Sequence, residues 1–258
     1  NGRIGRYPKP YVVIMDGITM GGGVGLSGHA SHRIATDSTK LAMPETGIGF
    51  FPDVGATWLL SHAPGELGTY MGLTGEAIGP ADAIAAGFAD CFVPADALTR
   101  LAEELAALHA TADAGAVSNL IAAFAGEAPA GHFIENRAII DRCFAFDTVE
   151  DILAALEEEK SPFADKTRAT LLTKSPTSLK VTLALLRAGR SSPDLEACLA
   201  REFAATAQTL KTPDFYEGIR AAIIDKDRNP KWSPATLDEV GPEIVEAFFQ
   251  PHPQPLFG

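Results

Sequence analysis

The sequence predicts an α/β protein in which short strands occupy the first third and helices occupy the remainder. Residues 11–15 (Tyr-Val-Val-Ile-Met) form a continuous apolar run rich in β-branched residues, which is typical of a strand buried on both faces. After Pro94 the composition changes to Ala, Leu and Glu at helical spacing. We therefore expect a strand-containing core over residues 1–94 and a helical region over residues 95–258.

The first third alternates strands and helices in short steps. A glycine-rich segment follows the first strand and leads into a short helix expected over residues 22–31. Residues 33–35 and 41–42 predict two short strands separated by a Thr-Asp-Ser turn. Residues 43–53 are predicted to form a loop, because prolines and glycines interrupt them. Further helices are expected at 54–61, 65–73 and 80–86, and a strand is expected at 91–93.

The helical region contains two clear start signals. Ser175-Pro176 and Thr212-Pro213 each place a capping residue before a proline at the first helical position. Helices are expected at 97–109, 133–143, 176–188, 194–210 and 214–224. Their apolar stripes must be buried either on the chain's own core or on a second copy of the chain. The second arrangement would make the protein a homo-oligomer.

Composition limits the class of partner. The chain has 33 acidic and 21 basic residues and a formal net charge of −12, which argues against a nucleic-acid-binding protein. No run reaches the roughly 18 apolar residues that a membrane span requires. The three cysteines are too widely spaced for a disulfide framework or a metal cluster, and they indicate reduced thiols inside a cell. A cytoplasmic location is expected, or a mitochondrial one if a targeting segment precedes Asn1.

The glycine-rich segment matches a dinucleotide-binding pattern only superficially. Residues 23–28 fit G-x-G-x-x-G, but the expected strand ends near Asp16, several residues before the first of these glycines. The next strand begins near Arg33, which leaves too few residues for a crossover helix. A bound nicotinamide or flavin is therefore not expected.

Two other candidate chemistries also fail on spacing. Ser27 lies in a segment similar to a nucleophile elbow, but His29 replaces the last glycine of that motif, so Ser27 is expected to pack or cap within a helix. His29 and His32 have no acidic partner at the spacing of a zinc protease. No metal site is expected.

Glu45 and Asp53 are the strongest candidates for chemistry. Both lie in a loop punctuated by Pro and Gly, where reactive groups are common, although an acidic residue in a loop is ordinarily just solvated. Glu45 precedes the apolar run 48–51, and burial there would favour its neutral form and prepare it for proton transfer. The glycines at 21–23 would let backbone N–H groups approach a ligand. Amides that can bind an oxyanion, together with carboxylates, favour acyl chemistry.

These residues together resemble the enoyl-CoA hydratase/isomerase (crotonase) superfamily. The similarity extends from Lys9 to Val93 and returns in three later segments, while residues 95–165 match mainly in helical character. The later segments are 174–180 (KSPTSLK), 214–221 (DFYEGIRA) and 224–232 (IDKDRNPKW). The resemblance implies a crotonase-like core of ββα spiral turns, followed by a helical C-terminal region.

Two positions associate the chain with the hydrolase branch of that superfamily. Hydratases have a catalytic Glu where this chain has Gly25, and they have a second Glu that corresponds to Glu45. Where hydratases have a glycine eight residues further on, the hydrolases have an aspartate, and this chain has Asp53. Ala56 departs from the family, which commonly has another glycine there. The resemblance therefore implies hydrolysis of a short 3-hydroxyacyl-CoA thioester, most of all 3-hydroxyisobutyryl-CoA in valine catabolism.

The resemblance also implies a role for each site residue. Gly21 and Gly22 would contact the substrate, and the Gly22 amide would donate to the oxyanion at a helix N-terminus. Glu45 would act as a general base on water or as a nucleophile that forms a mixed anhydride. Asp53 would orient the substrate hydroxyl or the attacking water.

Coenzyme A would enter only as part of the substrate, with no separate cofactor and no metal. Its phosphates require local cations, for which Lys9, Arg33 and Lys226 are weak candidates, because a solvated surface charge is the more common explanation for any one of them.

Two alternative functions remain open at this stage. One is an enoyl-CoA hydratase or isomerase, and the other is a non-catalytic acyl-CoA-binding subunit. The family's N-terminal part, which carries the first strands of the core, a second oxyanion amide and much of the CoA groove, is expected to lie outside this sequence. The sequence leaves open whether a chain without that part is active on its own.

Overall fold

The computed structural model describes residues 1–109, 112–254 and 256–257, and it divides into two compact units. The first unit combines residues 1–42 with 77–134, and the second combines residues 43–76 with 135–258. Each unit therefore takes part of its chain from either side of residue 94. The domain boundary that the sequence predicted after residue 94 was based on a change in composition, and it stays a prediction.

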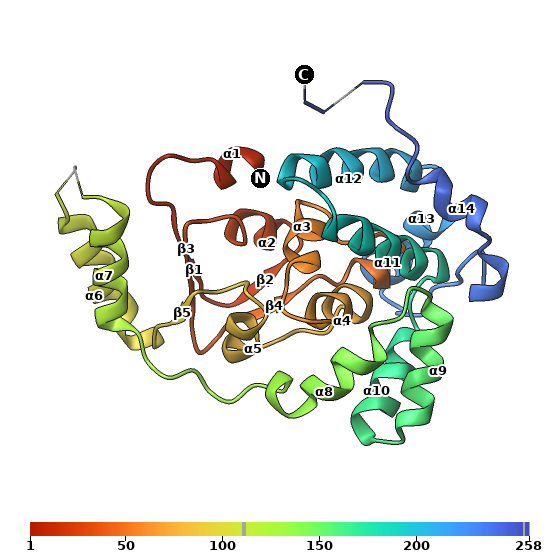
Figure 1. The fold of residues 1–258 in the computed structure, drawn as a ribbon, viewed down its shortest axis with the longest axis horizontal. Helices are drawn as coiled ribbons and strands as arrows, with labels where there is room; N and C mark the ends of the chain where they lie inside the picture. Colours follow the sequence, from red (N-terminus) through yellow and green to blue (C-terminus); the bar gives the residue numbers. More distant parts are fainter. Residues whose placement is uncertain (110–111, 255, 258) are drawn as a thin grey trace. The chain divides into compact units, whose positions relative to one another are not determined.

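The first unit contains two small parallel sheets (Figure 1). One has the order β1 (Val12–Met15), β3 (His32–Ala35), β5 (Cys91–Phe92), and the other pairs β2 (Ile18–Met20) with β4 (Lys40–Ala42). Val12 lies opposite His32 in the first sheet, and Ile18 lies opposite Lys40 in the second. Successive strands thus alternate between the two sheets, which is the ββα spiral expected from the sequence.

Strand β2 was missed by the sequence prediction, which placed the glycine-rich segment directly after the first strand. Gly17, with φ +115°, turns the chain between β1 and β2, a conformation that side chains other than glycine's rarely allow. Helix α2 then extends over Gly22–Ser27. It therefore ends four residues before residue 31, where the sequence predicted its end. Inside α2 the Ser27 Oγ donates to the Gly23 carbonyl at 2.9 Å, so this serine packs within a helix as expected.

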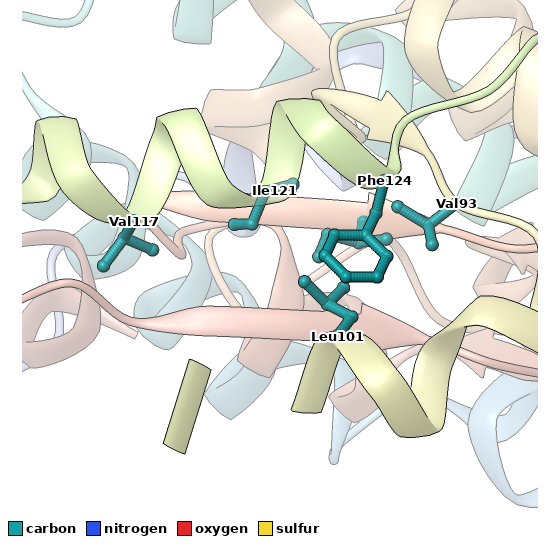
Figure 2. Packing of buried hydrophobic residues seen from close by; sticks show 6 residues of the cluster. Val93, Leu101, Val117, Ile121 and Phe124 are labelled. Carbon is teal, nitrogen blue, oxygen red and sulfur yellow. The ribbon is translucent and has the colours of Figure 1, made fainter. Parts of the chain in front are cut away.

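Helices α6 (Leu98–Ala107) and α7 (Ala114–Phe124) form an apolar cluster with the three-stranded sheet. In Figure 2, Leu101 and Val93 lie beside the Phe124 ring, and Ile121 and Val117 follow further along α7. The six buried members are Ile34, Val93, Leu101, Val117, Ile121 and Phe124. The remaining elements of this unit are α1 (Gly2–Gly5), α5 (Pro80–Ala85) and the 3₁₀ helix Ala95–Ala97.

The second unit is helical and is built around α11 (Pro176–Arg190). This helix packs against α3 (Ala56–Ser61), α4 (Leu67–Thr74) and α12 (Leu195–Thr209). Helices α9 (Val149–Glu159) and α10 (Pro162–Leu171) lie side by side (Figure 1). The other elements are the 3₁₀ helix Glu45–Ile48, α8 (Phe133–Cys143), α9 (Val149–Glu159), α10 (Pro162–Leu171), α13 (Pro213–Ile219), the π-helix Arg220–Ile224, the 3₁₀ helix Leu237–Glu239 and α14 (Pro242–Ala247).

The expected helices of the C-terminal region are present, with α8 at its expected bounds. Helices α7, α9, α10 and α14 were not predicted. The segment 43–53, expected as a loop, contains the 3₁₀ helix Glu45–Ile48. Among the described residues, none of the helices combines the length and the apolar character needed to cross a membrane.

Candidate active site

Glu45 is the first residue of the 3₁₀ helix Glu45–Ile48, which we call the Glu45 turn. Gly49, with φ +70°, ends the turn in the left-handed region, and the Phe50 amide donates to the Glu45 carbonyl at 3.0 Å. Prolines and glycines around the turn prevent a longer helix, so the Glu45 side chain leaves the backbone from a compact and well-defined corner.

A buried hydrogen-bond chain holds the Glu45 turn from the side of α11. The Asp214 carboxylate accepts from the Ser175 hydroxyl at 2.6 Å and from the Ser233 amide at 2.7 Å. The Ser175 amide donates to the Thr46 carbonyl at 3.2 Å, and the Ser175 Oγ caps α11 by accepting from the Ser178 amide. Segments 45–48, 175–178 and 214 are thus connected by polar groups whose hydrogen bonds are all made inside the protein.

Helix α13 approaches the Glu45 turn closely enough to require glycine. A Cβ on Gly218 would lie 2.2 Å from the Ile48 carbonyl oxygen, and a Cβ on Gly49 would lie 2.2 Å from the Asp214 carbonyl oxygen. Neither distance is sterically possible, so glycine at both positions allows the two backbones to touch. The residues that carry the family resemblance at 214–221 therefore serve to support Glu45.

The Glu45 carboxyl lies in a dry environment that favours its neutral form. Its side chain is only 7% exposed, and Oε2 has no hydrogen-bond partner among the described residues. Burial raises the pKa of Glu45 to about 8, and the negative charge of Asp53 adds to that shift. The structure thus brings together the two carboxyl groups that the sequence selected, and it confirms the dry environment expected for Glu45.

Asp53 lies at the start of a strained turn. It is half-buried, and burial raises the pKa of its carboxyl. The next two residues both have positive φ, at 57° for Val54 and 80° for Gly55. A β-branched residue such as Val54 rarely adopts this conformation, which costs on the order of 1–3 kcal/mol. Such strain persists only where the surrounding structure imposes it.

Glu202 of α12 supplies part of that support, and the sequence analysis missed it. Its carboxylate accepts from the Gly55 amide at 2.7 Å, from the Thr57 amide at 3.0 Å and from the Thr57 hydroxyl at 2.5 Å. These donors lie at the N-terminus of α3, where backbone N–H groups have no partner within the helix. Burial raises the pKa of Glu202 to about 7 despite these three bonds, with a contribution from Asp53.

A periodic signal for Glu202 was present in the sequence. Cys198, Glu202, Ala205 and Thr209 recur at spacings of three and four, so they lie on one face of α12, and all four are buried. A glutamate on the buried face of a helix requires partners, whereas one on the solvent face does not.

Gly21 and Gly22 belong to the first unit, whereas Glu45 and Asp53 belong to the second. Gly21 is the N-cap of α2 with φ +49°, and Gly22 is the first residue of the helix. A Cβ on Gly22 would meet no atom within 4 Å, so its backbone borders open space. Gly25, at the position where hydratases have a glutamate, is buried inside α2. The oxyanion role of Gly22 stays a prediction.

The structure distinguishes the three proposed cations. Arg33 forms an ion pair with Asp90 and donates to the Gly87 carbonyl at 2.6 Å, so its guanidinium already has partners. Lys9 and Lys226 are both exposed.

Sequence reasoning did not select Lys174 as a candidate cation. Its pKa is lowered by burial, and it lines a cavity of about 560 Å³ beside the Glu45 turn, together with Gly47, Ile48 and Arg228. In the described part of the chain, no group of three or more His, Cys, Asp or Glu side chains is arranged to hold a metal ion.

A comparison with models of known protein families identifies the family of this chain. The family model described as enoyl-CoA hydratase/isomerase matches residues 1–249. The chain belongs to the enoyl-CoA hydratase/isomerase family. The resemblance that residues 9–93 and the three later segments carry is therefore confirmed over nearly the whole chain.

Curated relatives within the family are named as hydrolases. The chain is 42% identical over 255 residues to the mitochondrial 3-hydroxyisobutyryl-CoA hydrolase of Rattus norvegicus, covering 97% of this chain and 66% of the relative. It is 41% identical to the probable 3-hydroxyisobutyryl-CoA hydrolase 3 of Arabidopsis thaliana, covering 95% and 66%. The chain thus spans about two thirds of the length of these relatives.

Solved structures in the family carry different names. A carnitinyl-CoA dehydratase from Mycobacterium thermoresistibile is 47% identical with a TM-score of 0.91, covering 98% of this chain and 72% of that one. An enoyl-CoA hydratase from Rhodobacter sphaeroides is 42% identical with a TM-score of 0.89, covering 100% and 73%. The crotonase-like fold is therefore confirmed, and the two sets of names define the functional alternatives.

Proposed function

We propose that the full-length protein hydrolyses a short 3-hydroxyacyl-CoA thioester, with 3-hydroxyisobutyryl-CoA as its substrate and 3-hydroxyisobutyrate and CoA as products in valine catabolism. The observation that carries this proposal is the identity of the carboxyl groups. Glu45 is a buried acid and Asp53 is a half-buried one whose charge acts on Glu45, whereas position 25 is a buried glycine. The names of the curated relatives support the same substrate.

The proposed chemistry follows from the charges that develop during thioester cleavage. The carbonyl oxygen becomes an oxyanion, and the Gly22 amide at the start of α2 would donate to it. Glu45 would either remove a proton from the attacking water or attack the carbonyl itself and form a mixed anhydride. A pKa of about 8 suits a general base, because such groups work best when their pKa lies near the working pH. Asp53 would orient the substrate hydroxyl or the water.

The first test is replacement of Glu45 by glutamine in the full-length protein. Release of free thiol from 3-hydroxyisobutyryl-CoA should fall by about 10²- to 10⁴-fold, as expected for loss of a general base or nucleophile. Near-full activity in the E45Q protein would show that the assignment of Glu45 is wrong. A single turnover in water enriched in oxygen-18 separates the two roles, since only a nucleophilic Glu45 incorporates the label.

A hydratase or isomerase is the second candidate, favoured by the names of the two solved structures. Adding water across an enoyl double bond uses the paired carboxylates of hydratases, one of which would lie at position 25. Because Gly25 supplies no carboxylate, crotonyl-CoA should keep its enoyl absorbance when it is incubated with the full-length protein. Loss of that absorbance without thiol release would favour the hydratase.

A non-catalytic acyl-CoA-binding subunit is the third candidate. It would bind CoA esters and release no thiol from any of them, an outcome that the same assay detects.

For the cellular location, the cytoplasm stays the expectation from the free thiols, while the rat and mouse relatives are named as mitochondrial.

We propose that coenzyme A enters only as part of the substrate and that no metal takes part. Activity of the full-length protein should then be unchanged after dialysis against EDTA. A loss that a divalent cation restores would contradict this proposal.

A further inference from the structure

Glu202 is a buried acid whose bonds all converge on the residues that follow Asp53. Its side chain is 3% exposed, and both carboxylate oxygens accept hydrogen bonds from the Gly55–Thr57 segment. The residue comes from α12, 147 positions along the chain from Gly55. Because the carboxylate is buried and both its oxygens are bonded to this segment, Glu202 is placed to hold the backbone and not to contact a substrate.

The segment that Glu202 holds is the one that needs support. Val54 and Gly55 adopt consecutive left-handed conformations, and such a β-branched residue relaxes to negative φ unless it is constrained. Rotation of the backbone at Val54 would swing the Asp53 side chain away from its place beside Glu45. The Gly55 and Thr57 amides bound to Glu202 prevent that rotation, because they fix the chain directly after the strained residue.

We propose that Glu202 is a positioning residue for the thioester hydrolysis, and that its carboxylate clamps the 53–57 segment so that Asp53 is held in its working orientation. This inference rests on the role proposed for Asp53 above. Glu202 acts on the reaction only through Asp53, so its effect must disappear when the Asp53 carboxylate is absent.

The first unit offers a matched control. Asp82 is also a buried carboxylate that accepts two backbone hydrogen bonds at a helix start, from the His132 and Phe133 amides at 2.9 Å each. It lies in the unit that contains neither Glu45 nor Asp53. The D82N variant therefore removes the same kind of support without touching the Asp53 segment.

The test is a double-mutant cycle in the full-length protein with the variants E202Q, D53N and E202Q/D53N. Glutamine preserves the volume of Glu202 but turns an amide NH₂ toward one of its backbone donors, so at least one of the three bonds is lost. In the wild-type background E202Q should lower kcat for thiol release by about 10- to 100-fold, the size expected from a misplaced catalytic group, while KM changes by less than about twofold. In the D53N background E202Q should change kcat by less than about twofold.

The control separates positioning from general stability. D82N should lower the midpoint of thermal unfolding as E202Q does, yet leave kcat within about twofold of wild type. Equal losses of kcat from E202Q in the presence and absence of the Asp53 carboxylate would overturn the inference, and so would a large loss of kcat in D82N. A D53N protein with full activity would instead contradict the role of Asp53 itself.

A milder variant keeps the test decisive if E202Q does not fold. T57V removes only the hydroxyl donor to Glu202 and leaves the amides of Gly55 and Thr57 in place. It should lower kcat by about two- to fivefold when Asp53 is present, the effect of one hydrogen bond, and have no effect in the D53N background. Unchanged kcat in a folded T57V protein, or equal losses in both backgrounds, would contradict the inference.

Discussion

At residue scale, the site depends on carboxyl groups whose ionisation the protein suppresses. Burial raises the pKa of Glu45, Asp53 and Glu202, and the proximity of Asp53 to the other two adds to the effect. Each of these acids is easier to protonate in the folded chain than in the unfolded one. The folded state therefore holds extra protons near neutral pH, and removing them costs stability.

Catalysis should follow the ionisation of Glu45. With a pKa of about 8, roughly a tenth of the free enzyme carries the charged form at pH 7. If the carboxylate is the active form, kcat/KM for thiol release should rise with pH and level off above about pH 8. A pH profile measured between 5.5 and 9.5 checks this. A profile that is flat from pH 6 to 9 would contradict it.

Stability should change with pH in the opposite direction. Because the folded pKa of Glu45 lies above the unfolded value of 4.5, the wild-type protein should lose stability as the pH rises from about 5 to 8. The E45Q variant cannot ionise there, so its unfolding midpoint relative to wild type should increase over that window. Thermal unfolding of both proteins at pH 5, 6, 7 and 8 measures this difference. A difference that stays constant with pH would count against burial as the cause.

At the scale of elements, the Glu45 turn and helix α13 are held in backbone contact. At Gly49 and at Gly218 a Cβ would overlap the backbone of the other segment. The hydrogen bond from Ser175 to Asp214 connects this contact to the start of α11. The orientation of Glu45 is thus set by three short segments that are distant in sequence.

Replacing Gly49 by alanine should move this contact. The new Cβ would overlap the Asp214 carbonyl oxygen, and the alanine backbone would have to adopt φ +70°. The free energy of unfolding should fall by about 2 kcal/mol or more, with a loss of thiol release. Gly87→Ala is the matched control, because Gly87 has φ +77° but open space around its Cβ, and it should cost only about 1 kcal/mol. Equal costs at both positions would mean that backbone strain, and not the contact with α13, is responsible.

At the scale of the whole molecule, the helical region presents apolar groups that its own unit does not cover. Ile223 and Ile224 of the π-helix are 60% and 69% exposed, and Tyr216 of α13 is 58% exposed. Exposed apolar side chains that form a contiguous patch often mark an interface. The homo-oligomer, one of the two arrangements that the sequence left open, stays a prediction, and these side chains offer a place to test it.

Sedimentation of the full-length protein at several micromolar concentrations tests that prediction. We expect a species larger than the monomer, and we expect Ile224→Asp to shift it toward the monomer because a charge is costly to bury. Ile134→Asp is the control, since Ile134 is 81% exposed on α8, and it should leave the distribution unchanged. A single monomeric species of the wild-type protein would contradict the expectation.

The sequence by itself determined the succession of strand β1, the glycines, helix α2 and strands β3 and β4, because apolar runs and Pro or Gly punctuation are local signals, whereas helices α7, α9, α10 and α14 gave no comparable signal. It also selected Glu45 and Asp53, because their position in a short loop and the spacing between them can be read without knowledge of the fold. Strand β2 was missed because three residues after the Gly17 corner are too few to show a period.

Only the tertiary structure decided how these acids are held and how they ionise. Glu202 reaches Gly55 across 147 positions, and Asp214 reaches Ser175 across 39. Such contacts form when separate helices pack against one another, so no local pattern encodes which residues will meet. Burial likewise depends on everything that surrounds a side chain, which is why the raised pKa of Glu45 follows from the folded structure and not from the sequence.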